Sequence, residues 1–366
     1  MKNLNEINII RAIMCLAIVV THSISNYLRN IEVDQAAYDQ YILWIRFALL
    51  CSTPIFILLS ETLISKNYPN GLKKGFFLKR VKYILLPYIF VGLIVSYRSS
   101  DKDLLSFMEV AFQKIVLGQW YGFFVIVIFQ FYILHWLIGK YLARINPIGP
   151  ILISFAISFA HVYCYVHIDA YQNFILTDYP LWYKTHIFMW LFYFIVAFYI
   201  GQYYEQLITF LTQKLWVPVL LTISSFGIIM YNYTEMDYTR ISSERYDMLL
   251  YSVSVFFLLV ALIRKFNFNN QTLVMISNFS FFIYLTHMIF LPYFVKLSLT
   301  FGENFFTYVS VMAFLTISAC IGVAFMLYQS RLTRYFTGKI KYLEPTPVNS
   351  KTPPVTREAY NVNYDR

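Results

Sequence analysis

The feature that most constrains the fold is a series of long apolar segments, separated by short stretches that hold most of the charged residues. Each segment is about 18 to 25 residues long, which is the length an α-helix needs to cross roughly 30 Å of hydrocarbon. Hydrophobic residues make up 59% of the 366 residues and charged residues only 13%, whereas about a quarter of the residues of a soluble domain are charged. The sequence therefore predicts an all-α, polytopic integral membrane protein.

We expect about ten transmembrane helices. By length and hydropathy they lie at residues 8–28, 41–64, 81–97, 120–142, 148–166, 186–204, 215–232, 247–263, 273–295 and 305–328. Residues 1–330 are expected to form one transmembrane domain. Residues 331–366 are first basic and then rich in proline, and we expect them to form a disordered cytoplasmic tail.

The basic residues predict the orientation, because Lys and Arg in short loops remain cytoplasmic. The connection between the second and third segments has no acidic residue and carries Lys66, Lys73, Lys74, Lys79, Arg80 and Lys82. With ten helices, the same side also receives Lys140, Arg144, Arg264, Lys265 and the basic residues from Arg331 to Lys341. The other side receives the acidic residues Glu32, Asp34, Asp39, Asp169, Asp178, Glu235, Asp237, Glu244 and Asp247. Both termini are thus expected in the cytoplasm, and the net charge of +10 indicates contact with lipids rather than with nucleic acid.

The first apolar segment has no clear cleavage site, so we expect it to remain as a signal anchor.

Cysteine and histidine positions give little support for a metal or a disulfide. All four cysteines fall within apolar segments and lack metal-ligand spacing: Cys15, Cys51, Cys164 and Cys320. A metal site is conceivable near the fifth and sixth segments, but the separation of the candidate ligands argues against it: His161, His167 and His186. We expect no metal and no permanently bound cofactor.

Arg11 and His22 lie within the first apolar segment, where an ionisable side chain costs a few kcal/mol or more. Eleven residues turn a helix by about 1100°, which is three turns plus roughly 20°, so both side chains share one face about 16 Å apart. One interpretation is an anion-binding cation and a proton acceptor on the same face. The other is that Arg11 reaches lipid headgroups and His22 hydrogen-bonds a neighbouring helix. The spacing alone leaves both open.

For the remaining polar residues of the segments the structural interpretation is favoured. Arg46 is expected to extend to the interface, with binding of the acceptor or of a headgroup phosphate as the alternative, and Glu61 is expected to pair with a loop lysine. His135 is expected to pack between helices. Trp120 and Tyr121 are expected to anchor the chain in the interfacial aromatic belt, with stacking on a sugar ring as the secondary interpretation.

Residues 11–22, RAIMCLAIVVTH, resemble the Arg-x10-His signature of the acyltransferase-3 family of membrane acyltransferases. Four further landmarks of that family follow in the same order: PIFILLSETLIS, FFLKRVKYILLPY, LGQWYGFFVIVIFQFYIL and SNFSFFIYLTHMIFLP. Glu61 stands where the family usually has glycine, and Lys82 where an Arg-x-Arg pair often ends. The last landmark places Ser280, Tyr284 and His287. The resemblance covers residues 8–330.

The resemblance implies an acyltransferase of the bacterial plasma membrane. Such an enzyme moves an acetyl or succinyl group from cytosolic acyl-CoA to a hydroxyl of an extracytoplasmic polysaccharide. Within the family the likeness is greatest to members concerned with poly-N-acetylglucosamine in biofilms, and a polysaccharide synthase complex is a further expected partner.

The resemblance also implies roles for particular residues. With Arg11, His22 is the expected catalytic residue, either as a general base or as the acyl carrier. Arg11, Arg80 and Lys82 are expected to bind the CoA phosphates. Support or lining of an acyl channel is expected for Tyr284, His287, Trp120 and Glu61, although a buried hydrogen bond between helices is slightly favoured for His287.

Two other classes of function remain open. The chain could export poly-β-1,6-N-acetylglucosamine, or it could be a structural subunit of a synthase complex. The acyltransferase is favoured because Arg11 and His22 suit acyl chemistry, and because the sequence has no ATP-binding loop or inverted repeat.

Overall fold

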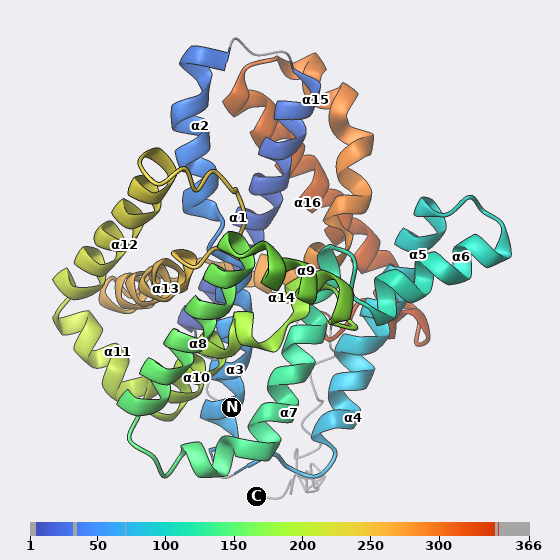
Figure 1. The fold of residues 1–366 in the computed structure, drawn as a ribbon. Helices are drawn as coiled ribbons and strands as arrows, with labels where there is room; N and C mark the ends of the chain where they lie inside the picture. The colour runs from blue at the N-terminus through green and yellow to red at the C-terminus, as the bar shows by residue number, and fades with distance from the viewer. Residues whose placement is uncertain (1–4, 32–34, 70, 341–342, 344–366) are drawn as a thin grey trace, which may run out of the picture.

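The computed structural model describes residues 5–31, 35–69, 71–340 and 343, and this part of the chain is helical without strands (Figure 1). The longer helices are α1 (Asn5–Asn30), α2 (Gln35–Leu49), α3 (Ser52–Asn67), α5 (Leu86–Ser99), α7 (Phe124–Leu142), α8 (Ile148–His167), α10 (Ile187–Gln202), α12 (Trp216–Thr234), α13 (Met248–Lys265), α14 (Gln271–Phe290) and α16 (Phe305–Gln329). Shorter elements are α4 (Phe76–Arg80), α6 (Leu104–Ala111), α9 (Asp169–Asp178), α11 (Tyr204–Gln213), α15 (Val295–Phe301), the π-helices η1 (Val81–Leu85) and η2 (Phe112–Val116), and the 3-10 helices η3 (Tyr121–Phe123), η4 (Tyr183–Thr185), η5 (Leu291–Phe294) and η6 (Thr333–Phe336).

Nine helical segments of the described residues are long and apolar enough to cross a membrane. They are Asn5–Asn30, Gln40–Asn67, Tyr121–Leu142, Ile148–His167, Tyr183–Gln202, Trp216–Thr234, Met248–Lys265, Gln271–Phe301 and Phe305–Gln329. Each corresponds to one expected segment, which confirms an all-α, polytopic membrane protein. The expected third segment, 81–97, is not among the nine, because the π-turn η1 leaves the 14-residue α5 as a separate element.

The second expected segment is interrupted between Leu49 and Ser52. Proline has no N–H, so Pro54 cannot donate a helical hydrogen bond to the carbonyl of Leu50. The chain resumes its helix at Ser52, with the amide of Ile55 bonded to the carbonyl of Cys51. This break places the N-terminus of α3 inside the span rather than at a membrane surface.

The helix α10 forms the centre of the molecule and is buried on almost every side by α3 and α8. At Gly201 an added Cβ would lie 2.6 Å from the carbonyl oxygen of Thr62, so only glycine permits this approach of α10 to α3. The Ser65 hydroxyl also donates to the carbonyl of Phe198 at 2.7 Å. Close contact through small residues and interhelical hydrogen bonds is the usual way in which membrane helices associate.

On the other side of the molecule, α1 packs against α14 and α16 (Figure 1). The Tyr308 hydroxyl of α16 donates to Asn26 near the end of α1, at 2.9 Å. Because α1 runs beside α14, residues near the middle of these two helices lie next to each other.

Ion pairs join the basic loops at one end of the molecule, which we call the basic end. Lys66 pairs with Glu205 at 2.9 Å, and Arg264 pairs with both Glu6 and Glu205. These contacts connect the start of α1 with the ends of α3 and α13, as the expected topology requires. The cytoplasmic placement of the basic end, and of both termini, stays a prediction.

The first part of the expected tail is packed rather than free. In η6 the Phe336 ring stacks on Phe90 of α5 at 4.3 Å, and the Lys82 ammonium lies 4.3 Å from the centre of the Tyr335 ring. Aromatic residues at the start of the tail thus have partners that composition alone did not indicate. The proline-rich part of the tail lies outside the described residues.

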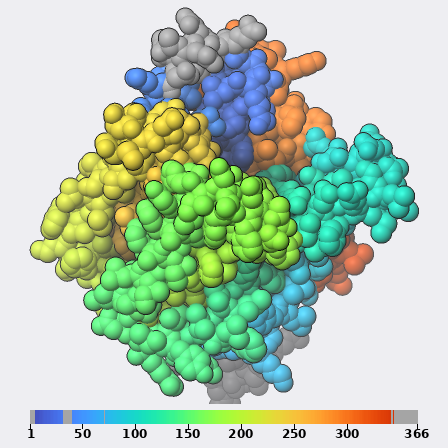
Figure 2. Space-filling model, in the orientation of Figure 1, coloured from blue at the N-terminus to red at the C-terminus, as the bar shows by residue number. Residues whose placement is uncertain are grey.

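The hairpin of α5 and α6 projects from the side of the molecule (Figures 1 and 2). The apolar side chains of Leu104, Leu105 and Met108 on α6 are exposed. The guanidinium of Arg98 donates to the carbonyl of Ile289 at 2.9 Å and ties the end of α5 to α14. The short helix α6 was not expected from the hydropathy of the sequence.

Candidate functional site

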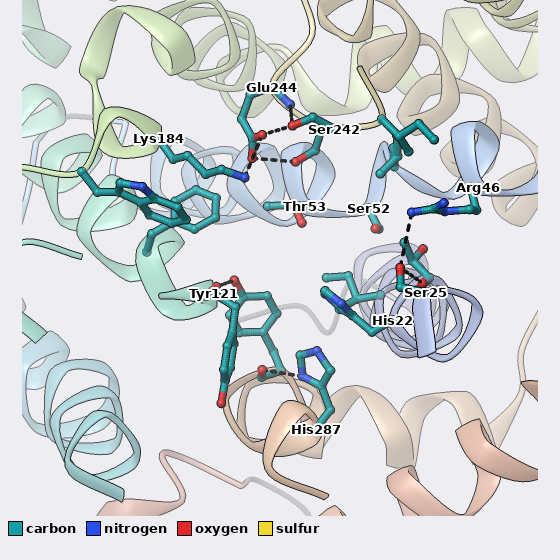
Figure 3. A pocket seen from close by; sticks show the side chains of 18 residues that line it. His22, Ser25, Arg46, Ser52, Thr53, Tyr121, Lys184, Ser242, Glu244 and His287 are labelled. Atoms are coloured by element: carbon teal, nitrogen blue, oxygen red, sulfur yellow. Dashed lines mark hydrogen bonds and ion pairs between the residues drawn. The ribbon is translucent and has the colours of Figure 1, made fainter. Parts of the chain in front are cut away.

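A cavity of about 290 Å³ lies within the helices (Figure 3). It contacts the second half of α1, whereas α1 begins at the basic end. Residues of α1, α2, α3, η3, η4, α14 and the loop 235–247 line it. Its polar lining residues include His22, Ser25, Arg46, Ser52, Thr53, Tyr121, Lys184, Ser242, Glu244 and His287. A space of this size with polar groups that converge from several helices is typical of a small-molecule site.

Two histidines face each other at this cavity (Figure 3). The rings of His22 on α1 and His287 on α14 have centroids 5.1 Å apart. Neither ring nitrogen of His22 has a hydrogen-bond partner that involves another described residue, so the ring is available to a ligand. The expected face of Arg11 and His22 therefore leads from the basic end to this cavity.

The hydrogen bonds of His287 define its tautomer. Its Nδ1 lies 2.7 Å from the carbonyl oxygen of Tyr284 and 3.1 Å from that of Ile283. A carbonyl oxygen only accepts, so Nδ1 carries the proton and Nε2 of the neutral ring is an acceptor. That Nε2 is buried and has no partner among the described residues. His287 bonds to its own helix, and not to a neighbouring helix as slightly favoured from the sequence.

Two tyrosines hold η3 against α14 beside the histidines. The Tyr121 hydroxyl donates to the carbonyl of Leu285 at 2.9 Å, and the Tyr284 hydroxyl donates to the carbonyl of Tyr121. The rings of Tyr121 and His287 meet edge to face with centroids 5.6 Å apart. Tyr121 is therefore a cavity residue, and its expected place in the interfacial aromatic belt is wrong.

Trp120 is buried and also does not belong to the interfacial belt, being only 4% exposed. Its indole N–H donates to the Tyr88 hydroxyl at 3.1 Å, and that hydroxyl donates to the carbonyl of Ile115 at 2.9 Å. The indole also packs on the Tyr121 ring. Hydropathy could not distinguish an aromatic ring that turns inward from one that faces lipid. Trp120 therefore packs against the cavity residue Tyr121 without lining the cavity itself.

Arg46 also turns into the cavity instead of extending to the interface. The guanidinium donates to the Ser25 hydroxyl at 3.4 Å, while its buried Nε has no partner. No acidic side chain of the described residues pairs with it. An arginine that is largely withdrawn from water without a carboxylate partner favours an anionic or strongly polarised ligand group.

An ion pair forms the rim of the cavity opposite the histidines (Figure 3). Lys184 Nζ lies 3.1 Å from Glu244 Oε2, and the hydroxyls of Ser242 and Ser243 donate to the same carboxylate. Burial acts to raise the pKa of Glu244, but the Lys184 ammonium and the Ser242 hydroxyl outweigh it, so the pKa lies below its usual 4.5. Glu244 is therefore a carboxylate at neutral pH.

The loop that carries Glu244 is held by Arg245, which is only 1% exposed. Its guanidinium donates to both carboxylate oxygens of Asp247, at 2.8 and 2.6 Å, and to the carbonyls of Tyr238 and Arg240. These contacts fix the loop between α12 and α13, so that Ser242 and Glu244 keep their place at the rim.

Glu61 is a supporting residue away from the cavity. It is fully buried, and its Oε1 lies 2.6 Å from Nδ1 of His135, which links α3 to α7. The expected partner, a loop lysine, is wrong, since Lys66 pairs with Glu205 instead. Packing between helices is confirmed for His135, which is 2% exposed.

The three cations expected to bind CoA phosphates do not line the cavity. Arg80 lies over the rings of Phe76 and Tyr132, and Lys82 over that of Tyr335. No acidic side chain of the described residues is paired with Arg11, Arg80 or Lys82, so their charges are available to an anion. Their joint role in donor binding stays a prediction.

The histidines near the loop between α8 and α10 pack against other rings, and one pair of them is stacked. The rings of His161 and His186 lie 4.3 Å apart, with His161 Nδ1 2.8 Å from the Tyr171 hydroxyl, and His167 packs on Tyr163. In the part of the chain that the structure describes, no cluster of three or more His, Cys, Asp or Glu side chains could hold a metal ion.

The fold and the cavity define a multi-pass membrane protein with a histidine pair and several cations inside its helical bundle. Comparison of the sequence with known families gives a match to the acyltransferase domain over residues 4–327. The chain belongs to this family of membrane acyltransferases, as the motifs indicated.

Two relatives extend the comparison. The chain is 33% identical over 341 residues to the probable poly-beta-1,6-N-acetyl-D-glucosamine export protein of Staphylococcus aureus strain MRSA252, covering 92% of this chain and 96% of the relative. It is 33% identical over 345 residues to the protein of the same name in Staphylococcus epidermidis, covering 93% and 96%. No solved structure matches the chain.

Several cavity residues were missed or misjudged from the sequence, above all Arg46, Lys184 and Glu244. Lys184 and Glu244 are 60 positions apart and lie in loops, where a charged residue is ordinarily solvated. One available signal was Pro54 within the second apolar segment, because a helix break inside a span often lines a cavity.

Proposed function

We propose that the chain is a membrane-bound O-acyltransferase of the bacterial plasma membrane. It would move an acetyl or succinyl group from cytosolic acyl-CoA to a hydroxyl of an extracytoplasmic polysaccharide, with poly-N-acetylglucosamine as the acceptor. The observation that carries this proposal is the His22 and His287 pair at a polar cavity. Membership of the acyltransferase family supports the reaction, and the names of the relatives support the choice of polysaccharide.

In the proposed reaction His22 accepts the proton of the acceptor hydroxyl. The oxygen attacks the thioester carbonyl, the carbon–sulfur bond breaks, and the imidazolium returns its proton to the CoA thiolate. The products are an ester and free CoA. His287 supplies an unprotonated Nε2 that would orient the His22 ring or take the proton in its place. An acyl-His22 intermediate is the alternative route.

The Arg46 guanidinium, which lines this space, would stabilise the negative charge that develops on the carbonyl oxygen. Fixed charges in a site shielded from water are effective at such stabilisation. The Glu244 carboxylate and the Ser242 hydroxyl offer hydrogen bonds of the kind that sugar hydroxyls accept and donate.

The donor would reach this cavity from the basic end. Arg11 shares a face of α1 with His22 and lies about 16 Å from it along the axis. CoA phosphates at Arg11, Arg80 and Lys82 would leave the pantetheine arm to extend along α1 towards His22. The unpaired state of these three cations supports this placement.

The proposal is tested with purified protein in nanodiscs, supplied with acyl-CoA and poly-N-acetylglucosamine oligomers. Wild-type protein should release CoA only when the oligomer is present and should form a base-labile ester. His22→Ala should lower this rate by about 10²- to 10⁴-fold, the usual contribution of a general base. Ser23→Ala, on the same helix but outside the cavity lining, serves as a matched control for insertion and folding. A His22→Ala rate equal to that of wild type would reject the catalytic role.

Export of the polymer is the second candidate, because the relatives are named as probable export proteins. A cavity of about 290 Å³ is at the small end of small-ligand sites, which favours chemistry on one sugar residue over passage of a chain. An exporter or a structural subunit would not depend on the proton-accepting side chain of His22.

A further inference from the structure

A second cavity, of about 460 Å³, lies on the outer surface at the basic end. We call it the basic-end groove. It is lined by Trp136, Leu137, Lys140 and Tyr141 at the end of α7, by Arg144 just after this helix, and by Gly71 and Leu72 of the loop between α3 and α4. This groove is separate from the histidine cavity and shares no lining residue with it.

The groove joins exposed apolar surface to two cations. Trp136, Leu137 and Tyr141 expose 61%, 52% and 66% of their surfaces, although α7 belongs to a membrane-spanning segment. Lys140 lies between Leu137 and Tyr141 in the chain, Arg144 follows the end of α7, and both side chains are exposed. An apolar wall, amphipathic rings and cations in one groove match the acyl chain, glycerol region and phosphate of a phospholipid.

The two cations have no counter-charge in the described part of the chain. No acidic side chain there pairs with Lys140 or Arg144, in contrast to Lys66 and Arg264 at the same end of the molecule. The Lys140 stem passes over Gly71, where an added Cβ would be 2.9 Å from Lys140 Cε. Gly71 thus lets the lysine side chain lie across the loop and close the groove.

We propose that the basic-end groove binds the headgroup of one anionic phospholipid of the adjacent leaflet. Charge complementarity selects an anionic lipid over a zwitterionic one, and the exposed apolar wall selects a lipid over a free phosphate. Basic pockets beside membrane helices on the cytoplasmic side recognise anionic headgroups in this way. The site is independent of acyl transfer.

Native mass spectrometry of the full chain, released from nanodiscs of mixed phosphatidylglycerol and phosphatidylcholine, tests the proposal. Wild-type protein should retain one phosphatidylglycerol in preference to phosphatidylcholine. Each cation near a lipid surface changes binding roughly fivefold, so Lys140→Gln with Arg144→Gln should weaken retention about 25-fold. The matched control, Lys73→Gln with Lys74→Gln, removes the same charge from exposed lysines outside the groove and should retain the lipid.

Charge-preserving exchange, Lys140→Arg with Arg144→Lys, should also keep the lipid and shows that a loss is not a folding defect. Equal loss in the groove and control pairs would overturn the proposal, because it would indicate a general charge effect. Equal retention of the two lipids by wild-type protein would do the same. Displacement of the lipid by inorganic phosphate or by CoA at equal concentration would also overturn it, since the groove would then be a site for a soluble anion.

Discussion

At the scale of single residues, the cavity brings together side chains whose hydrogen-bond partners differ in an informative way. His287 is fixed by two carbonyls of its own helix, whereas His22 has both ring nitrogens available. Lys184 is neutralised by Glu244, whereas Arg46 has only a serine hydroxyl. The groups without strong partners, His22 and Arg46, are therefore the ones that a substrate would engage.

Arg46 offers a test of which acyl group is transferred. If the donor is succinyl-CoA, its free carboxylate would pair with the guanidinium, a charge-assisted contact of about 1.5 to 3 kcal/mol. Arg46→Gln should then lower kcat/KM for succinyl-CoA about 10- to 100-fold more than for acetyl-CoA, as measured by CoA release. Arg29→Gln is the charge-matched control, because Arg29 lies in the last turn of α1 and does not line the cavity. An equal loss with both donors would assign Arg46 to the reacting carbonyl and not to a carboxylate.

Only part of this site could be predicted from the sequence. His22 was found because its spacing from Arg11 and the family motif both point to it. Arg46, Lys184 and Glu244 come together only through the packing of α2, η4 and the loop 235–247, which no local pattern encodes. Trp120 and Tyr121 were placed at the membrane surface because their amphipathic rings suit both environments.

At the scale of elements, α1 connects the proposed donor site with the histidine cavity. Arg11 lies at the donor end of this helix. Arg11→Lys keeps the charge but loses the planar fork, so acyl-CoA binding should weaken. Arg11→Ala should weaken acyl-CoA binding further, to an affinity about one to two orders of magnitude below that of wild type. Titration of acyl-CoA into protein in nanodiscs at low and high salt would measure this, with salt affecting the alanine variant least. Equal affinity in all three proteins would leave Arg11 as a membrane anchor.

The close approach of α10 to α3 gives a second test at this scale. Gly201→Ala should destabilise the protein by about 1 to 3 kcal/mol, because its Cβ would meet the Thr62 carbonyl and the backbone of α3 must move. Gly227→Ala on α12 meets no atom within 4 Å and is the matched control, which should be neutral or slightly stabilising. Thermal unfolding in nanodiscs compares them. Equal melting temperatures would contradict the tight contact.

Helix positions were predicted well because a span of hydrocarbon imposes a length that hydropathy records. The interruptions were not. The break at residues 50–51 depends on Pro54 and falls inside a run that remains apolar, so local hydropathy cannot locate it. The π-turn at 81–85 includes Lys82 and lies where its segment begins, and hydropathy does not distinguish a π-turn from an α-helical turn.

At the scale of the whole molecule, the gathering of the basic loops at one end predicts which face meets the cytoplasm. In intact cells, a membrane-impermeant maleimide should label Asp178→Cys but not Lys73→Cys. Both substitutions are made in a Cys164→Ser background, since Cys15, Cys51 and Cys320 are buried. After the cells are opened, Lys73→Cys should also react. The reverse pattern in intact cells would invert the topology and place the histidine cavity in the cytoplasmic half.

If the histidine cavity catalyses the proposed reaction, acylation, and not export, requires His22. The decisive measurement is the ester-linked acyl content of surface poly-N-acetylglucosamine, by NMR before and after mild base, in cells that carry wild-type protein or His22→Ala. We predict that the variant inserts normally and that polymer reaches the surface without acyl esters. Undiminished acylation in a well-expressed variant, or polymer trapped inside the cells, would contradict the account.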